Sequence, residues 1–205
     1  MKLLSILTLV VCVALAGCSS PSSPGPVYNY FPLSVGSNWN YFDGTKTYVR
    51  TIVGDTTIKG RSYAVLLQNP KSQYAQRLPD SVWYLRKDGN NVYNLLPDTS
   101  GGFTECLFIN ASAGTSGSYA TLTAIGSERL VTKTNYLVKQ QNFRDTVDSK
   151  IYQNVILEHI RSEILHPGSI SVVTEGDYYF ADGVGLIDQI VYGDLTLELT
   201  GYLIK

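Results

Sequence analysis

Apolar and polar residues alternate with period two in this chain, and that pattern constrains the fold more than any other feature. In TKTYVRTIV, residues 45–53, an extended strand would place Tyr48, Arg50 and Ile52 on one face. Val53 would lie on the opposite face. Because side chains point alternately to the two faces of a strand, this pattern predicts a half-buried strand.

The closing stretch DLTLELTGYLIK, residues 194–205, shows the same alternation more clearly. Its leucines share one face, and threonine and glutamate occupy the other. One apolar face and one polar face are typical of a strand in an antiparallel sheet. The leucines on the predicted buried face are Leu195, Leu197, Leu199 and Leu203.

Glycine paired with aspartate, asparagine or lysine recurs between the predicted strands. These pairs supply the positive φ angles that tight hairpin turns require, so each predicts a turn. The turns are expected at FDGT (42–45), VGDT (53–56), IKGR (58–61), KDGNN (87–91) and YGDL (192–195).

The stretch IYQNVILEHIRSEILH, residues 151–166, fits two structures. As a helix it would place Ile156, Ile160 and Ile164 on one flank together with Leu157. As a strand it would place the three isoleucines on one face and Leu157 on the other. Its neighbours are strand-like and no firm helix stop precedes Pro167, so we predict a strand.

Composition agrees with a β protein, because tyrosine occurs fifteen times and valine, isoleucine and threonine recur. The 188 residues from 18 to 205 are enough for one domain with a sizeable core and few for two. We therefore expect a single antiparallel β domain over residues 30–205, built as a curved sheet, a half-barrel or a sandwich.

The first seventeen residues combine one charge, Lys2, with an unbroken apolar run that ends in small residues. This is typical of a cleaved export signal, so we assign residues 1–17 as a signal peptide. The stretch LAGC, 15–18, resembles the lipobox of bacterial lipoproteins. The resemblance implies cleavage before Cys18 and attachment of several acyl chains, palmitate among them, which anchor the chain to a membrane.

Residues 18–29 comprise the lipidated cysteine and a serine- and proline-rich tether. At ~3.3 Å per residue its eleven residues after Cys18 reach at most about 36 Å, so the domain should lie close to the bilayer. Ser19 stands where many Gram-negative lipoproteins carry an aspartate if they stay in the inner membrane. By that resemblance we expect the outer membrane, with the domain facing the periplasm.

The formal net charge of the whole chain is −1 and the charges are scattered. A nucleic-acid-binding protein would need a basic stripe, so we expect no nucleic-acid partner. Besides the membrane, the expected partners are an envelope protein, a lipid or a glycan.

Cysteine and histidine are too few to predict a reactive centre. Cys106 remains alone once Cys12 leaves with the signal and Cys18 carries lipid, so no internal disulfide is expected. Its apolar neighbours predict a buried thiol. His159 and His166 would lie on opposite faces of one strand. We expect no catalytic residues, no metal site and no cofactor.

Five residues are weak candidates for ligand binding. Trp39 and Tyr41 share one face of the first predicted strand, where they either fill the core or line a groove for sugar or lipid. His159, Arg161 and Glu163 share a face of the 151–166 strand. They form either a polar site or a solvated ladder of charges, and the second alternative is favoured.

YFPLSVGSNWNY, residues 30–41, and YYFADGVGLIDQ, residues 178–189, together resemble a broad group of uncharacterised bacterial lipoproteins. Members begin with a Phe-Pro-Leu, Gly, Trp-x-Tyr pattern and carry a late Tyr-Phe-Ala, Gly-Val-Gly-Leu pattern. The resemblance implies an exported β domain without known catalytic residues.

Three functions are therefore compatible with the sequence. The first is a non-catalytic binding or structural module of the cell envelope. The second is a carrier of a lipid or other hydrophobic ligand in a half-open β-barrel, and the third is an envelope hydrolase with an unrecognised carboxylate site.

Overall fold

The computed structural model describes residues 26–71, 81–100, 102–111, 114–125, 128–166, 169–192 and 196–205. Over these residues the chain forms twelve strands and no helix, which confirms the predicted all-β fold and the strand at 151–166. Accordingly, this part of the chain offers no helix that is long and apolar enough to cross a membrane. The signal peptide, Cys18 and most of the tether lie outside the described residues.

All twelve strands belong to one antiparallel sheet. They are β1 (Asn38–Phe42), β2 (Thr47–Ile58), β3 (Arg61–Lys71), β4 (Ser81–Asp88), β5 (Asn91–Pro97), β6 (Phe103–Ile109), β7 (Ser116–Ile125), β8 (Glu128–Val147), β9 (Lys150–His166), β10 (Ser169–Ala181), β11 (Gly185–Val191) and β12 (Thr196–Leu203).

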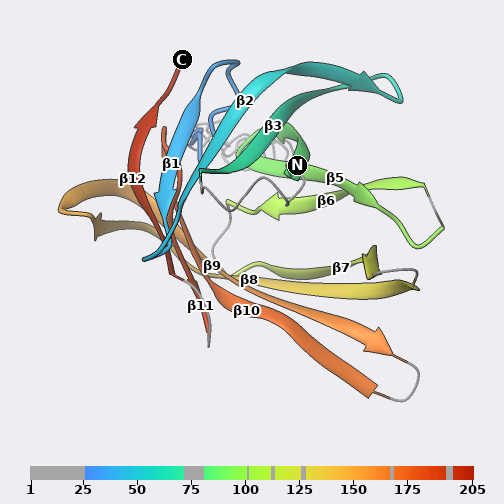
Figure 1. Cartoon of the computed structure of the whole chain (residues 1–205). Helices are drawn as coiled ribbons and strands as arrows, with labels where there is room; N and C mark the ends of the chain where they lie inside the picture. The colour runs from blue at the N-terminus through green and yellow to red at the C-terminus, as the bar shows by residue number, and fades with distance from the viewer. Residues whose placement is uncertain are drawn as a thin grey trace, which may run out of the picture.

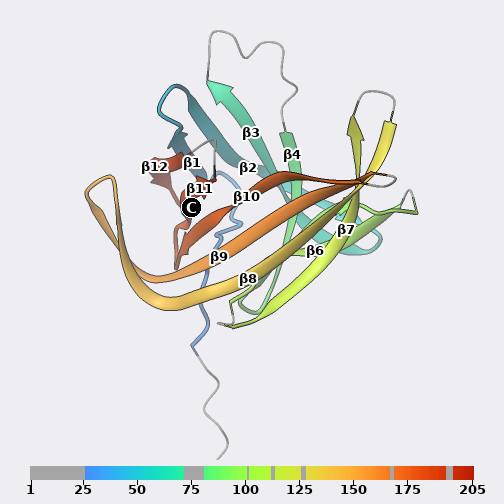
Figure 2. The same cartoon turned by 90° about the horizontal axis from the view of Figure 1, so that it is seen from below.

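The sheet consists of two six-stranded meanders that meet between the first and last strands. The strand order is β6-β5-β4-β3-β2-β1-β12-β11-β10-β9-β8-β7, and β1 pairs with β12 antiparallel. The sheet curls into a nearly closed barrel, with β6 and β7 as its two free edges (Figure 1). From below, β8, β9 and β10 run side by side along one flank (Figure 2).

The alternation in β2 is confirmed, and that in β12 is confirmed in part. Arg50 and Ile52 are buried, and Leu197 and Leu199 face the core. Leu203, however, is half exposed, so its predicted place in the buried row is wrong. The ladder to β1 shifts register at Leu199, and this bulge reverses the faces of the residues that follow it. Leu195 lies outside the described residues.

The predicted turns are confirmed at Gly44, Gly60 and Gly89, each of which has a positive φ in a hairpin connection. The turn expected at 53–56 is wrong. Gly54 lies inside β2, immediately after a register shift against β3. A glycine within a strand often marks a bulge, and here the strand continues past it. The YGDL turn falls largely outside the described residues.

Residues 26–37 form a strap that crosses one end of the barrel before β1 begins. The Tyr28 backbone N–H donates to Asn90 Oδ1 in the β4–β5 turn at 2.9 Å. The Asn29 backbone N–H donates to Asp182 Oδ1 in the β10–β11 turn at 2.6 Å. Since these turns belong to different meanders, the strap holds the two halves of the sheet together.

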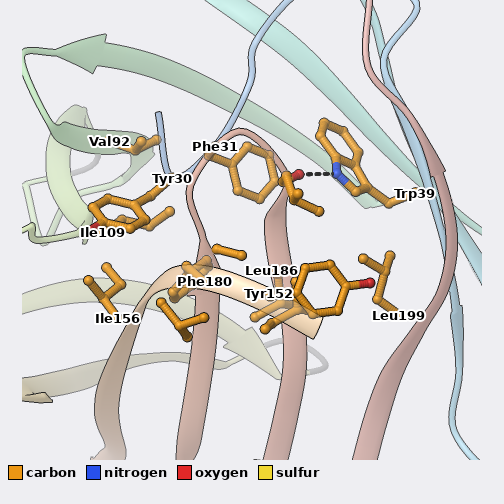
Figure 3. Packing of buried hydrophobic residues seen from close by; sticks show 14 of the residues in the cluster. Tyr30, Phe31, Trp39, Val92, Ile109, Tyr152, Ile156, Phe180, Leu186 and Leu199 are labelled. Atoms are coloured by element: carbon orange, nitrogen blue, oxygen red, sulfur yellow. Dashed lines mark hydrogen bonds between the residues drawn. The ribbon is translucent and has the colours of Figure 1, made fainter. Parts of the chain in front are cut away.

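The strap also supplies part of the core. Tyr30 and Phe31 are fully buried, and Phe31 packs on Trp39 with 5.0 Å between ring centroids. Figure 3 shows these rings above Phe180 and Leu186, which come from the other meander. The prediction that the apolar stretch after the tether seats on the core is therefore confirmed.

Candidate functional site

The two sequence motifs, residues 30–41 and 178–189, meet in the core. Trp39 Nε1 donates to the Val184 carbonyl at 2.5 Å, and the Tyr41 hydroxyl donates to the Leu186 carbonyl at 3.0 Å (Figure 3 draws the first). Trp39 and Tyr41 are both fully buried. The prediction that they are core residues is confirmed, and neither is open to a ligand as a groove wall would be.

Beyond this core, the interior of the barrel contains a cavity of about 330 Å³, which we call the interior pocket. Side chains from both meanders line it. Its polar lining includes Arg50, Gln68, Asn94, Ser162, Thr174 and Gln189. Its aromatic lining consists of Trp83, Phe108, Tyr119 and Tyr178. A cavity of this size with convergent polar groups is typical of a small-molecule site.

Arg50 is the charged group of the interior pocket. Only 5% of it is exposed, and within the described part of the chain it forms no ion pair. Its guanidinium carbon lies 4.9 Å from the centre of the Tyr41 ring and 5.0 Å from that of Trp83. Nε donates to Gln68 Oε1 at 2.7 Å, whereas Nη1 has no hydrogen-bond partner. Burial lowers the pKa of Arg50, and the neighbouring Tyr41 acts against this shift.

Two more buried polar side chains lack partners in the barrel interior. Asn94 lines the pocket, and its Oδ1 accepts no hydrogen bond. Glu158 lies next to Tyr178 in the β9–β10 ladder, and neither of its carboxylate oxygens has a partner at hydrogen-bonding distance. Burial raises the pKa of Glu158 to about 8, and the Asn110 backbone N–H acts on this pKa in the opposite direction. At neutral pH Glu158 is therefore mostly protonated and uncharged.

The strap supports the wall of the pocket through a row of rings. Phe31 lies 6.0 Å from Phe108, and Phe108 lies 5.7 Å from Trp83, each pair edge to face. Cys106 is buried nearby on β6, as predicted. Burial raises its pKa to about 11, so the thiol is protonated at neutral pH. The rings thus form a continuous packed row from the strap to the pocket, and the protonated Cys106 thiol is a poor nucleophile.

His159, Arg161 and Glu163 lie on the outer face of β9, away from the interior pocket. Arg161 Nε donates to Glu163 Oε1 at 2.8 Å, and Arg161 Nη1 donates to Glu175 Oε2 at 3.2 Å. His159 Nδ1 lies 2.8 Å from Asp177 Oδ1. The three candidates are therefore brought together in a ladder of charges across β9 and β10, as the favoured alternative predicts.

Asp177 is the centre of this outer ladder. Besides His159, it accepts hydrogen bonds from Lys139 Nζ and from the Tyr192 hydroxyl, both at 2.8 Å. Burial alone would raise the pKa of Asp177, but these three partners outweigh it and lower the pKa. Each charge in the ladder already has an opposite charge beside it, so the arrangement stabilises the sheet surface and leaves no group free for a ligand.

A second outer cluster surrounds Glu105 on β6. Glu105 accepts hydrogen bonds from Arg61, from the Tyr63 hydroxyl and from both Nε and Nη2 of Arg86. The Arg86 hydrogen bonds, more than any other contact, lower the pKa of Glu105 to about 2. A hollow of about 490 Å³ adjoins this cluster. It is larger than the interior pocket, but it lies on the outer face and its carboxylate, Glu105, is already paired with Arg61 and Arg86, so it is the weaker candidate site.

The groups that make the interior pocket were not predicted from the sequence. Arg50 was placed on the correct strand face, and Glu158 falls on the same face of β9 as Ile156 and Ile160. A charged residue within an otherwise apolar period-two row is the signal that would have found both. As for metals, the described residues contain no group of three histidine, cysteine or acidic side chains that could hold an ion.

Comparison with known proteins gives a likeness of fold. No protein-family model matches the chain, and no curated protein matches its sequence. A solved structure from Bacteroides fragilis, assigned as an exported protein with a YmcC-like fold, has a TM-score of 0.56 at 11% identity, covering 87% of this chain and all of that one. A protein from Parabacteroides distasonis, assigned as a lipoprotein, also has a TM-score of 0.56, at 10% identity, covering 86% of this chain and 99% of that one. The chain therefore shares the barrel-like fold of these exported proteins.

Proposed function

We propose that this protein is a lipid-anchored lipoprotein of the bacterial cell envelope that binds a small molecule in its interior pocket without transforming it. The observation that carries the proposal is the set of buried, unpartnered polar groups around that cavity, Arg50 and Asn94 above all. Buried polar groups are nearly always hydrogen-bonded in folded proteins, so groups left unpaired around a cavity point to a ligand.

Location follows from the sequence and is supported by the neighbours in fold. The lipobox at 15–18 favours an anchor on Cys18, and the residue after it favours the outer membrane, with the domain in the periplasm. One neighbour in fold is assigned as exported and the other as a lipoprotein. The two motifs that resemble uncharacterised bacterial lipoproteins agree with this proposal.

The lining of the pocket favours a water-soluble ligand over a lipid. A carrier of acyl chains needs a large apolar cavity, whereas this one is small and has the charged Arg50 and several neutral polar side chains in its lining. A hydrolase is also less favoured. The buried Cys106 thiol is protonated, and His159 is engaged by Asp177 on the outer face. These observations favour the binding module among the three functions.

Thermal unfolding of the full-length protein in detergent tests the proposal. We would add water-soluble organic acids, sugars and nucleosides, and palmitate as a fourth class, because a ligand that binds only the folded state raises the melting temperature. Stabilisation by one water-soluble class, with the compound recovered unchanged, supports the proposal. Stabilisation by palmitate alone would favour the lipid carrier, and turnover of any compound would favour an enzyme.

A further inference from the structure

The burial of Arg50 carries a free-energy cost that the described chain does not offset. Moving a charge out of water costs several kcal/mol even after the protein relaxes, and proteins normally offset this with an opposite charge. The described side chains that contact the Arg50 guanidinium are Gln68, Tyr41 and Trp83, and they are neutral. The site therefore has a net positive charge in a low-dielectric interior.

Among the described residues, Glu158 is the buried acidic residue that could balance Arg50, but it does not pair with it. Glu158 is buried in the same barrel, but it forms no ion pair with Arg50 among the described residues. It is also mostly uncharged at neutral pH, since burial raises its pKa to about 8. Among the described residues no acidic side chain balances Arg50, which favours a bound anion as its counter-ion.

Arg50 is also held in a fixed orientation. Tyr41 and Trp83 each lie about 5 Å from the guanidinium, and Gln68 binds its Nε edge. Arg50 lines the pocket, and no acidic side chain among the described residues pairs with its Nη groups. A planar guanidinium fixed along one edge presents a paired-donor edge that suits the two oxygens of a carboxylate or a phosphate.

The rest of the pocket limits the body of the ligand. Aromatic rings, Trp83 and Phe108 among them, form one part of the lining, and Asn94 contributes an amide. A volume of about 330 Å³ is near the lower limit of small-molecule sites, so it suits one ring better than a nucleotide or an acyl chain.

We infer that the interior pocket binds a small organic anion, a carboxylate or phosphate group carried on a single ring, with Arg50 as its counter-ion. This inference rests on the proposed binding function and specifies its ligand class. The ring packs against the aromatic wall, and the anion pairs with the Arg50 guanidinium.

Three ring compounds that differ in charge test the inference on the full-length protein in detergent. Benzoate carries the carboxylate, phenyl phosphate carries the phosphate, and benzyl alcohol is a neutral compound of similar size. Because a hydrogen bond to a charged partner is worth about 1.5–3 kcal/mol, we expect one of the anions to bind at least about tenfold more tightly than the alcohol in calorimetric titration. The tighter of the two anions identifies the acidic group.

Two variants locate the effect. Arg50→Met should remove the preference for the anion and should leave the melting temperature equal or higher, because it removes an unpaired buried charge. Arg61→Met removes an exposed arginine from the outer face and should leave binding unchanged.

Several outcomes would overturn the inference. Failure of both anions to bind at millimolar concentration, or equal binding of the alcohol, would show that no anion site exists. A preference for the anion that survives Arg50→Met would place the site elsewhere. If a neutral sugar or nucleoside stabilises the protein while both anions fail, the inference is wrong and the proposed binding function stands.

Discussion

Gly185 lies where the β10–β11 turn brings the backbone against the Trp39 indole. Its φ is +110°, and a Cβ there would lie 3.3 Å from Trp39 Nε1. Gly183 in the same turn also has a positive φ, of +72°, but its Cβ would meet nothing within 4 Å. Substitution of Gly183 therefore tests backbone strain alone, whereas substitution of Gly185 also tests crowding of the hydrogen bond between Trp39 and Val184.

We expect Gly183→Ala to lower the free energy of unfolding by roughly 1–2 kcal/mol, the cost of a left-handed residue with a Cβ. Gly185→Ala should cost more, because the new methyl group also displaces the indole that donates to Val184. Urea denaturation of both variants measures the difference. Equal losses would show that the contact between the two motifs contributes nothing beyond the turn.

Glu158 should make stability depend on pH. It faces Tyr119, Tyr136 and Tyr178, and burial raises its pKa from 4.5 to about 8 against the effect of the Asn110 N–H. The folded state therefore holds the proton more tightly than the unfolded state does. The stability that this proton gives is fully present below about pH 4.5 and is lost as pH rises to about 8, at a slope of at most about 1.4 kcal/mol per pH unit.

Glu158→Gln should remove that slope. We expect the variant to unfold at higher urea concentration than the wild type at pH 8 and at nearly the same concentration at pH 4.5. Glu163→Gln, on the outer face of the same strand, is the matched control and should bring no gain at pH 8. If the difference in unfolding free energy between the wild type and Glu158→Gln is the same at every pH, the Glu158 carboxyl is not the source of the pH dependence.

At the level of single residues, the sequence was sufficient for the core and insufficient for the pocket. Trp39 and Tyr41 were correctly assigned because their strand face is fixed by alternation. The importance of Arg50 was not predictable, because its partners Gln68 and Trp83 come from strands whose order in the sheet no local pattern specifies. Whether a charged side chain is buried depends on the tertiary structure. The sequence shows only that Arg50 lies on the strand face that it shares with Tyr48 and Ile52.

At the level of elements, the strap is the segment that ties the two meanders together. Asn90 accepts from Tyr28, and Asp182 accepts from Asn29. Asp182→Ala should lower stability by about 0.5–1.5 kcal/mol, the usual net worth of a hydrogen bond, and should speed amide exchange at Asn29. Hydrogen exchange followed by mass spectrometry over residues 26–37 measures the exchange rate, and urea denaturation measures the loss of stability.

Asp98→Ala provides the control for the strap. Asp98 accepts from the Ser100 and Gly102 backbone N–H groups in the β5–β6 turn, with the same chemistry but no contact to the strap. Its loss should leave exchange at Asn29 unchanged. If both variants speed exchange there equally, the strap opens only when the whole domain unfolds.

The elements themselves were largely predictable, and the errors have one cause. The strand at 151–166 and the turns at Gly44, Gly60 and Gly89 were correct because pattern and turn chemistry are local. The turn at 53–56 and the inward place of Leu203 were wrong because both lie at or after a bulge. A bulge depends on the register of the partner strand, which the sequence of one strand does not reveal.

At the level of the whole molecule, the proposed lipid anchor on Cys18 would determine where the pocket operates. We expect Cys18→Ser to move the protein from the membrane fraction to the soluble fraction, because one substitution removes the site of every acyl chain that the lipobox implies. Palmitate labelling of the wild type and fractionation of both proteins measure this. Ser19→Ala keeps the cysteine and should remain membrane-bound; an unlabelled wild type would refute the anchor.

The position of the two free edges has a consequence for assembly. β6 and β7 are joined by the chain but not by a ladder, whereas β1 and β12 are joined by a ladder but not by the chain. Each six-stranded meander could therefore pair its terminal strand with that of a second molecule and form the same β1–β12 ladder between two chains. The connection between β6 and β7 would act as the hinge of such a domain-swapped dimer. At high concentration two molecules can therefore exchange halves of the barrel. The β1–β12 ladder that joins the halves in such a dimer is the one already present in the monomer.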